Sequence, residues 1–339
     1  MTLRAPALAV GALVALGALL AAQERPDGPG FSFRAGVDLI NVTATVTDEN
    51  GRFVPGLRAD DFALTEDGKP RPIEQFDVER VPVSLGIALD TSGSMLGDKM
   101  EAAQDALHRF LYDLLTDQDQ VFLYKFDTKP TLVHGWTDDR DLVARTLGSV
   151  KAYGGTAIYD TVAEAVPLAQ SGTRKKKALV IISDGNDTNS RTKAADVVNL
   201  IRRTEVLVYA IGIDASGERR PVVSAPTGPR VLPVPSPFPG KERPPIVVPA
   251  KPATPNATDR INVGILQSLT DETGGRTEII VSVRDLVPAT AGIADELSQQ
   301  YFLAYNSAVP KDGGWHTIDV RLKRQGAYTV RARRGFTAN

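Results

Sequence analysis

The stretch VSLGIALDTSGSM, residues 83–95, decides the fold and carries the first candidate site residues. Its first eight residues, VSLGIALD, are apolar along nearly their whole length, which is typical of a strand covered on both faces. The strand is expected to end at Asp90, and Ser92 and Ser94 follow at alternate positions with a glycine between them. Three interpretations of DTSGS are open at this point: a turn, a phosphate-handling site or a metal site.

Three more apolar runs of the same kind follow, and helical patterns separate them. The runs are QVFLYKFD (120–127), KALVIISD (177–184) and EVLVYAIGID (205–214). The main helical patterns are KMEAAQDALHRFLYDLLT (99–116), DDRDLVARTLGSV (138–150), TAIYDTVAEAVPLAQSG (156–172) and TKAADVVNLIRRT (192–204). Buried strands that alternate with amphipathic helices predict an α/β fold, with a mostly parallel, doubly wound, Rossmann-like sheet and right-handed crossovers.

Both ends of the chain have β patterns instead. VDLINVTATVTD (37–48) alternates apolar and polar residues, and DDFALTEDGKPRPIEQFDVE (60–79) indicates two short strands around an Asp-Gly turn. YFLAYNSA, WHTIDVRLKR and AYTVRARRGF close the chain with further strand patterns. We therefore expect residues 37–82 and 299–339 to form one small all-β sandwich, into which the α/β domain, residues 83–298, is inserted.

Two segments are predicted to lie outside these domains. Residues 1–22 have the layout of a secretory signal peptide, and residues 23–36 that of a linker. No stop-transfer segment follows, so we expect export to the periplasm or the extracellular space without a retained transmembrane anchor. Residues 215–260 hold 12 of the chain's 23 prolines, which forbids helix and central strand and predicts an extended or disordered surface insertion.

Composition narrows the chemistry further. The formal net charge of −2 argues against nucleic acid as the main partner. The one dense basic cluster, RKKK at 174–177, is interpreted as a solvated helix end. The sequence has no cysteine, which excludes disulfides, a thiol nucleophile, cysteine-ligated zinc and a lipid-bearing cysteine.

The phosphate-handling and hydrolase interpretations of DTSGS fail on their own requirements. A haloacid-dehalogenase-type phosphatase needs a second carboxylate two residues after the nucleophilic aspartate, where this chain has Ser92. No glycine-rich loop ending in GKS or GKT is present. A Ser/His/Asp hydrolase needs a histidine, and the three histidines, His108, His134 and His316, fall in separate predicted elements.

The metal interpretation requires more oxygen ligands from other strand ends, because Mg²⁺ takes about six. GGTAIYD (154–160) opens a helix with Thr156 at its start, where the hydroxyl can either cap the helix or bind metal. SDGND (183–187) ends a buried strand and places Asp184 at the same edge of the sheet, in either a turn or a ligand role. The order DxSxS, GGT, SDG is unlikely to arise by chance.

This set of three loops resembles the metal-ion-dependent adhesion site of the von Willebrand factor A (VWA) domain, and the order of elements from about 83 to 298 is similar to that fold. Asp90, Ser92, Ser94, Thr156 and Asp184 match the five family positions without substitution. The segments on either side are similar to those around the A domain in a VWFA-related group of secreted bacterial proteins, known best from acidobacteria. The proline-rich insertion is the main departure.

The resemblance implies that the two serines and the threonine touch a divalent cation, Mg²⁺ first and Mn²⁺ or Ca²⁺ as alternatives, while the aspartates act through water. It implies a binding module, not an enzyme, whose ion bridges to an Asp or Glu side chain of a partner protein. Two alternatives remain: a structural or scaffold protein whose metal only locks the sheet edge, and a metal-assisted hydrolase.

Overall fold

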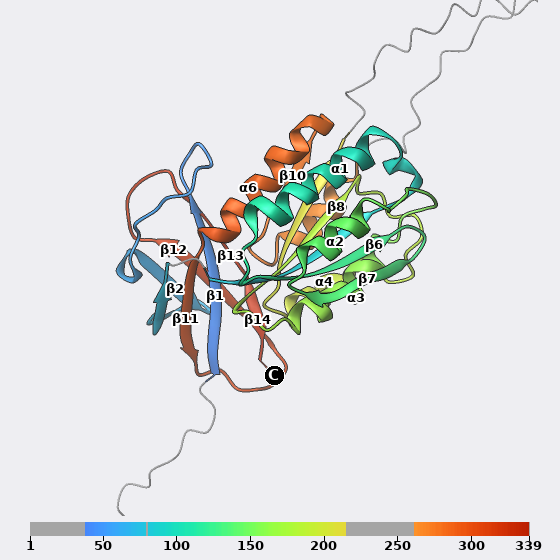
Figure 1. Ribbon diagram of the computed structural model, residues 1–339. Helices are drawn as coiled ribbons and strands as arrows, with labels where there is room; N and C mark the ends of the chain where they lie inside the picture. Colours follow the sequence, from blue (N-terminus) through green and yellow to red (C-terminus); the bar gives the residue numbers. More distant parts are fainter. Residues whose placement is uncertain (1–37, 79–80, 215–260, 339) are drawn as a thin grey trace, which may run out of the picture. The chain divides into compact units, whose positions relative to one another are not determined.

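The computed structural model describes residues 38–78, 81–214 and 261–338, and residues 38–339 group into one unit. The predicted signal peptide, the linker and the proline-rich insertion lie outside the described residues. The elements that can be followed in Figure 1 are a six-stranded sheet with helices on both faces, and two four-stranded antiparallel sheets built from both ends of the described chain.

The central sheet has the strand order β10-β9-β8-β5-β6-β7. Its strands are β5 (Val83–Asp90), β6 (Gln120–Phe126), β7 (Pro130–Thr137), β8 (Lys176–Ser183), β9 (Leu207–Ile213) and β10 (Thr277–Ile280). Strand β5 pairs in parallel with β6 on one side and β8 on the other, and only the edge strand β7 is antiparallel in this described sheet. The mostly parallel sheet that the buried apolar runs predict is therefore confirmed.

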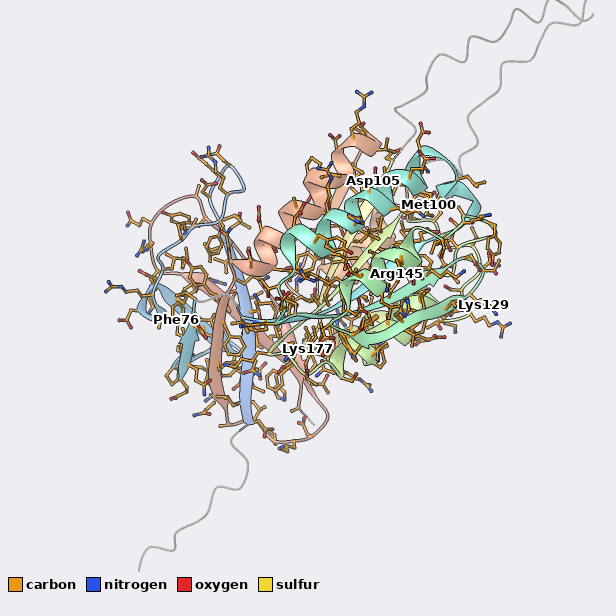
Figure 2. All side chains as sticks on the ribbon, in the orientation of Figure 1. Phe76, Met100, Asp105, Lys129, Arg145 and Lys177 are labelled. Carbon is orange, nitrogen blue, oxygen red and sulfur yellow. The ribbon has the colours of Figure 1, made fainter. Side chains whose placement is uncertain are left out.

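Helices cover both faces of this sheet. They are α1 (Asp98–Arg109), which continues into a π-helical turn (Phe110–Leu114), α2 (Arg140–Leu147), α3 (Ile158–Gln170), α4 (Ala194–Arg202), α5 (Val263–Thr270) and α6 (Leu286–Ser298). Helices α1, α2 and α6 share one hydrophobic core with alternate residues of β5, and α3, α4 and α5 share the core on the opposite face. Figure 2 labels two residues of α1, Met100 and Asp105. Met100 is buried and Asp105 is exposed, as an amphipathic helix requires.

The two ends of the described chain form the predicted sandwich. One sheet has the order β13-β1-β11-β4 and the other β14-β12-β2-β3. The strands are β1 (Asp38–Thr47), β2 (Phe62–Glu66), β3 (Lys69–Arg71), β4 (Gln75–Asp77), β11 (Tyr301–Ser307), β12 (Trp315–Leu322), β13 (Thr329–Ala332) and β14 (Gly335–Thr337). Because β1 pairs with β11, and β2 with β12, each sheet needs both ends of the chain.

One sequence interpretation is wrong. The cluster RKKK does not end a helix, because Lys176 is the first residue of β8 and is buried, with 4% of its surface exposed. Its ammonium group donates a hydrogen bond to the carbonyl oxygen of Leu297, at the end of α6. The buried lysine is satisfied by a partner 121 residues away in sequence, which local composition does not reveal.

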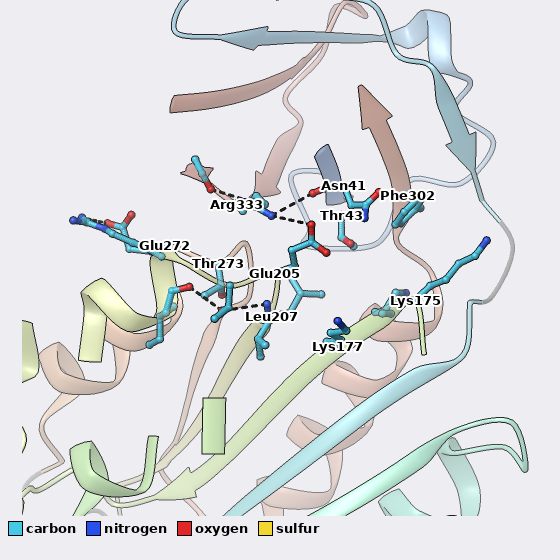
Figure 3. Close-up of a pocket in the computed structure, with 16 residues that line it drawn as sticks. Asn41, Thr43, Lys175, Lys177, Glu205, Leu207, Glu272, Thr273, Phe302 and Arg333 are labelled. Carbon is cyan, nitrogen blue, oxygen red and sulfur yellow. Dashed lines mark hydrogen bonds and ion pairs between the residues drawn. The ribbon is translucent and has the colours of Figure 1, made fainter. Parts of the chain in front are cut away.

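Polar contacts join the sandwich to the α/β domain. Glu296 of α6 is nearly buried, and its carboxylate accepts hydrogen bonds from four side chains. These are Thr45 Oγ1 (3.3 Å), Tyr209 Oη (3.1 Å), Arg276 Nε (2.9 Å) and Arg331 Nη2 (2.6 Å). A second ion pair joins the two domains: Arg333 approaches Glu205 to 3.6 Å, and both line a pocket of about 20 Å³ (Figure 3), which is room for about one water molecule. Donors from both domains therefore converge on one α6 carboxylate.

Candidate metal centre

Asp90 occupies the last position of β5 and has no exposed surface. Its Oδ1 accepts a hydrogen bond from the amide of Ser92 (2.8 Å), and its Oδ2 accepts one from Ser183 Oγ (2.5 Å). Ser183 ends β8, the parallel neighbour of β5, so the carboxyl ends of the two strands meet at one edge of the sheet. The sheet itself therefore fixes the position of the Asp90 carboxylate.

The two serines of DTSGS lie against each other. Ser92 is buried and Ser94 is exposed, and their hydroxyl oxygens are 2.9 Å apart. A short 3₁₀ turn, Gly93–Met95, brings them together and leads into α1. The motif thus places two hydroxyl oxygens directly after the buried carboxylate, the second of them on an exposed residue.

The second loop is tied to the first by backbone hydrogen bonds. The amide of Gly93 donates to the carbonyl of Gly154 (2.9 Å), and the amide of Tyr153 donates to the carbonyl of Thr91 (2.8 Å). Gly154 has a φ of 83°, a backbone conformation that favours glycine. The first glycine of the GG pair before Thr156 is therefore needed for the backbone conformation of this loop.

Thr156 is buried on this second loop, just before α3. The residue at the N-cap of α3 is Ala157, without a side-chain cap, so Thr156 does not take the capping role that the sequence left open. The carbonyl oxygen of Thr156 accepts hydrogen bonds from the amides of Thr188 and Asn189, both at 2.9 Å. Thr156 thereby connects the second loop to the third.

Asp184 follows β8 directly and is buried, with 6% of its surface exposed. Its Oδ2 lies 3.4 Å from the ammonium nitrogen of Lys99 on α1. Its Oδ1 is buried and has no hydrogen-bond partner within the described parts of the chain. Such an orphaned carboxylate oxygen is costly to bury, and it marks a position where a cation fits.

Electrostatics at this edge are unfavourable for the protein alone. The pKa of Asp90 is raised to about 6: burial is the main cause and the negative charge of Asp184 adds to it, while the hydrogen bonds from Ser183 and Ser92 partly offset the rise. Within residues 38–78, 81–214 and 261–338, no three His, Cys, Asp or Glu side chains gather in a way that could hold a metal. The donor set here is two carboxylates and three hydroxyls, all hard oxygens, and it suits Mg²⁺, Mn²⁺ or Ca²⁺.

The structure thus brings the three predicted loops together at one sheet edge through hydrogen bonds between them. Two contributors were missed from the sequence. Ser183 was overlooked although a hydroxyl directly before Asp184 at a strand end is a usable signal. Lys99 carries no sequence signal, because its contact with Asp184 spans 85 residues and depends on how α1 packs.

The histidines lie away from this site. His134 Nε2 is 2.6 Å from Thr146 Oγ1, and His316 Nδ1 is 2.8 Å from Asp67 Oδ2 in the sandwich. His108 is exposed on α1, with its ring 4.6 Å from that of Tyr112. The three histidines therefore do not meet a serine and an aspartate in a hydrolase arrangement within the described chain.

Comparison with known proteins matches residues 85–186 to the family model of the von Willebrand factor type A domain, a range that contains all five candidate residues. Inter-alpha-trypsin inhibitor heavy chain H4 of Homo sapiens is 27% identical over 153 residues, which cover 40% of this chain and 16% of that protein. An uncharacterized protein of Synechocystis is 26% identical over 137 residues, or 39% of this chain and 32% of that one. The chain therefore spans less than a third of the length of these relatives.

Solved structures give weaker similarities. A von Willebrand factor type A structure from Catenulispora acidiphila is 15% identical, covers 82% of this chain and 74% of that chain, and has a TM-score of 0.46. Proximal thread matrix protein 1 from the mussel byssus, solved with a zinc-occupied MIDAS motif, is 12% identical. It covers 68% of this chain and 49% of that chain, with a TM-score of 0.48.

Proposed function

Because this chain carries a von Willebrand factor type A domain, we propose that it binds a partner protein through a divalent cation held at the carboxyl edge of its central sheet. The observation that carries the proposal is the pair of buried acids at that edge. Asp90 is fully buried, and Asp184 keeps one carboxylate oxygen without a hydrogen-bond partner among the described residues. Uncompensated buried charge is unfavourable, and a bound cation compensates it.

Each site residue has a separate task. The hydroxyl oxygens of Ser92, Ser94 and Thr156 are neutral donors that suit direct contact with the ion. Asp90 and Asp184 contribute the negative charge that attracts it. The hydrogen bond from Ser183 orients the Asp90 carboxylate and holds β8 against β5.

The charge balance favours an acidic partner. Two positive charges of the ion and one of Lys99 exceed the two negative charges of Asp90 and Asp184 by one. The bound cation supplies a positive centre that a carboxylate of a partner protein can complete, in a charge-assisted contact stronger than a neutral one. Ser94 is an exposed residue, which places this centre on the side that solvent reaches.

We further propose that the bound ion is Mg²⁺, that the protein is exported, and that it binds its partner without catalysing a reaction. Hard oxygen donors support Mg²⁺. The layout of residues 1–22 supports export. Asp90 and Asp184 have proposed ligand roles, and the other two carboxylates of these motifs, Asp160 and Asp187, accept hydrogen bonds from neighbouring loop residues. This supports binding over hydrolysis. In the described part of the chain, no helix combines the length and apolar character needed to cross a membrane.

The proposal is tested by metal-dependent capture. Purified protein is immobilised and exposed to envelope and secreted proteins of the source organism, once in MgCl₂ and once in EDTA. Thr156→Ala removes one hydroxyl at the site. Thr290→Ala removes an equally buried hydroxyl in α6, where it bonds only backbone carbonyls of its own helix, and serves as the matched control.

We expect the protein to capture a partner in Mg²⁺ and to release it in EDTA. The Thr156→Ala variant should lose this capture, and the Thr290→Ala variant should keep it. If capture is lost only under conditions in which the protein also unfolds, the metal has a structural role, and the structural alternative is favoured. Metal-dependent turnover of generic phosphate or ester substrates, with no capture, would favour the hydrolase and contradict the proposal.

A further inference from the structure

The most exposed apolar side chains of the described chain gather at the edge of the sheet that holds the candidate metal centre. Among the large hydrophobic residues, Leu96 has 64% of its surface exposed, Val281 has 60% and Tyr153 has 58%. Leu96 comes after β5 and Val281 comes directly after β10, while Tyr153 lies on the loop between α2 and α3, whose backbone is hydrogen-bonded to Thr91 just after β5. Single exposed apolar residues are ordinary, but two of these, Leu96 and Tyr153, lie on the loops of one candidate site, which is characteristic of an interaction surface.

Leu96 and Tyr153 belong to the loops that form the candidate site itself. Leu96 follows the turn that contains Ser94, and Tyr153 precedes Thr156 by three residues. The two loops are paired by the hydrogen bonds Gly93 to Gly154 (2.9 Å) and Tyr153 to Thr91 (2.8 Å). The paired backbone therefore places Leu96 two residues after Ser94 and Tyr153 three residues before Thr156, on adjacent loops; we call these two exposed residues the rim of the site.

Val281 lies further along the same edge. It follows β10, which is separated from β5 by β9 and β8 in the sheet. At about 4.8 Å per strand, three steps place it roughly 14 Å from the end of β5. A short segment centred on the ion therefore reaches Leu96 and Tyr153 but not Val281.

We propose that the partner presents its carboxylate next to a large apolar side chain, and that Leu96 and Tyr153 receive this apolar side chain while the carboxylate completes the ion. This inference rests on the proposed function and specifies its partner. The site is complementary to a partner with an acidic and an apolar side chain. The positive charges of the ion and Lys99 attract the carboxylate. Exposed Tyr153 and Leu96 offer apolar surface, and aromatic side chains in particular often contribute much of the binding energy of an interface.

The test uses a defined set of capped pentapeptides titrated into ¹⁵N-labelled protein in saturating MgCl₂. Gly-Gly-Glu-Gly-Gly provides the acid alone, Gly-Leu-Glu-Gly-Gly and Gly-Gly-Glu-Phe-Gly add an apolar neighbour, and Gly-Leu-Gln-Gly-Gly removes the charge. Amide shifts of the three loops report the dissociation constant. Leu96→Ser and Tyr153→Ser remove the rim, and Val281→Ser is the control for an equally exposed residue on the same edge.

The leucine and phenylalanine peptides should bind roughly fivefold or more tightly than the glycine peptide, as expected for partial burial of one large apolar side chain. The Leu96→Ser and Tyr153→Ser variants should lose this preference but keep their Mg²⁺ affinity, and Val281→Ser should keep both. The glutamine peptide should not bind.

Two results overturn the inference and are distinguishable from each other. Equal, metal-dependent affinities for all acidic peptides, or a preference that survives in the rim variants, would refute the apolar rim while leaving the proposed function standing. Binding of no acidic peptide in Mg²⁺ would refute the proposed function and this inference with it. Circular dichroism of each variant checks that the fold is retained.

Discussion

Replacing Asp90 by asparagine is expected to make the metal-free protein more stable while abolishing its metal affinity. The asparagine has nearly the same shape, so its Oδ1 can still accept the Ser92 amide (2.8 Å) and its amide group can face Ser183. What disappears is a negative charge with no exposed surface, close to that of Asp184. A site that gives up stability to hold charge is expected of a binding centre.

The magnitude follows from the pKa. Burial raises the pKa of Asp90 from 3.8 to about 6, and each tenfold change in a proton equilibrium is worth about 1.4 kcal/mol, so the charged form costs roughly 3 kcal/mol. A group whose pKa is higher in the folded than in the unfolded state does not destabilise the folded protein below about pH 4. The protein loses stability as the pH rises from about 4 to about 6, and the full loss remains above that range. The Asp90→Asn variant should lack this loss.

The assay is urea denaturation followed by circular dichroism, at pH 4 to 7 in EDTA and again in MgCl₂, with calorimetric metal titration beside it. In EDTA at pH 7 the variant should be more stable by up to about 3 kcal/mol. Mg²⁺ at 100 times its dissociation constant should stabilise the unmodified protein by about 2.7 kcal/mol and the variant by nothing. A variant that is less stable without metal, or that still binds Mg²⁺, would refute the reasoning.

Three further substitutions test separate parts of the account. Lys99→Met removes a cation 3.4 Å from Asp184, so calorimetry should show Mg²⁺ affinity higher by roughly three- to tenfold; unchanged affinity would show that Lys99 does not compete with the ion. Gly154→Ala forces a side chain onto a φ of 83° and should cost about 1–2 kcal/mol in denaturation. Because the Gly154 carbonyl pairs with Gly93, metal affinity should fall as well, and intact affinity would mean that the pairing of the loops is dispensable. Glu296→Gln removes the charge that Arg276 and Arg331 share at the domain junction and should cost about 2–4 kcal/mol; a matching fall in metal affinity, instead of none, would reveal coupling between junction and site.

The patterns of apolar and polar residues along the sequence predicted most of the strands and helices. The apolar run 83–90 indicates a strand buried on both faces, and all eight of its residues are buried in β5. Val42, Ala44 and Val46 alternate with polar residues, and all three are fully buried in the sandwich core. In both segments, local sequence and tertiary burial agree, so the prediction of element type and layer was confirmed.

Local patterns could not show contacts made at long range. The segment AYTVRARRGF reads as one strand but forms β13 and β14, which belong to different sheets, because the chain crosses between the sheets at Arg333 and Arg334. β7 is antiparallel because its tight connection to β6, from Phe126 to Pro130, leaves no room for a crossover helix. The spacing of the Asp, Ser and Thr residues in the sequence was enough to predict the candidate ligands. The exposure of Leu96 and Tyr153 is known only from the folded structure.

The central claim is that a divalent cation sits among three loops at the carboxyl edge of the central sheet, and paramagnetic broadening by Mn²⁺ tests it most directly. Sub-stoichiometric MnCl₂ is added to ¹⁵N-labelled protein, and amide signals are followed residue by residue before and after excess MgCl₂. The account predicts that amides of residues 90–95, 153–157 and 184–186 broaden first and together, and that Mg²⁺ restores them. Broadening centred elsewhere, or confined to one of the three loops, would contradict it.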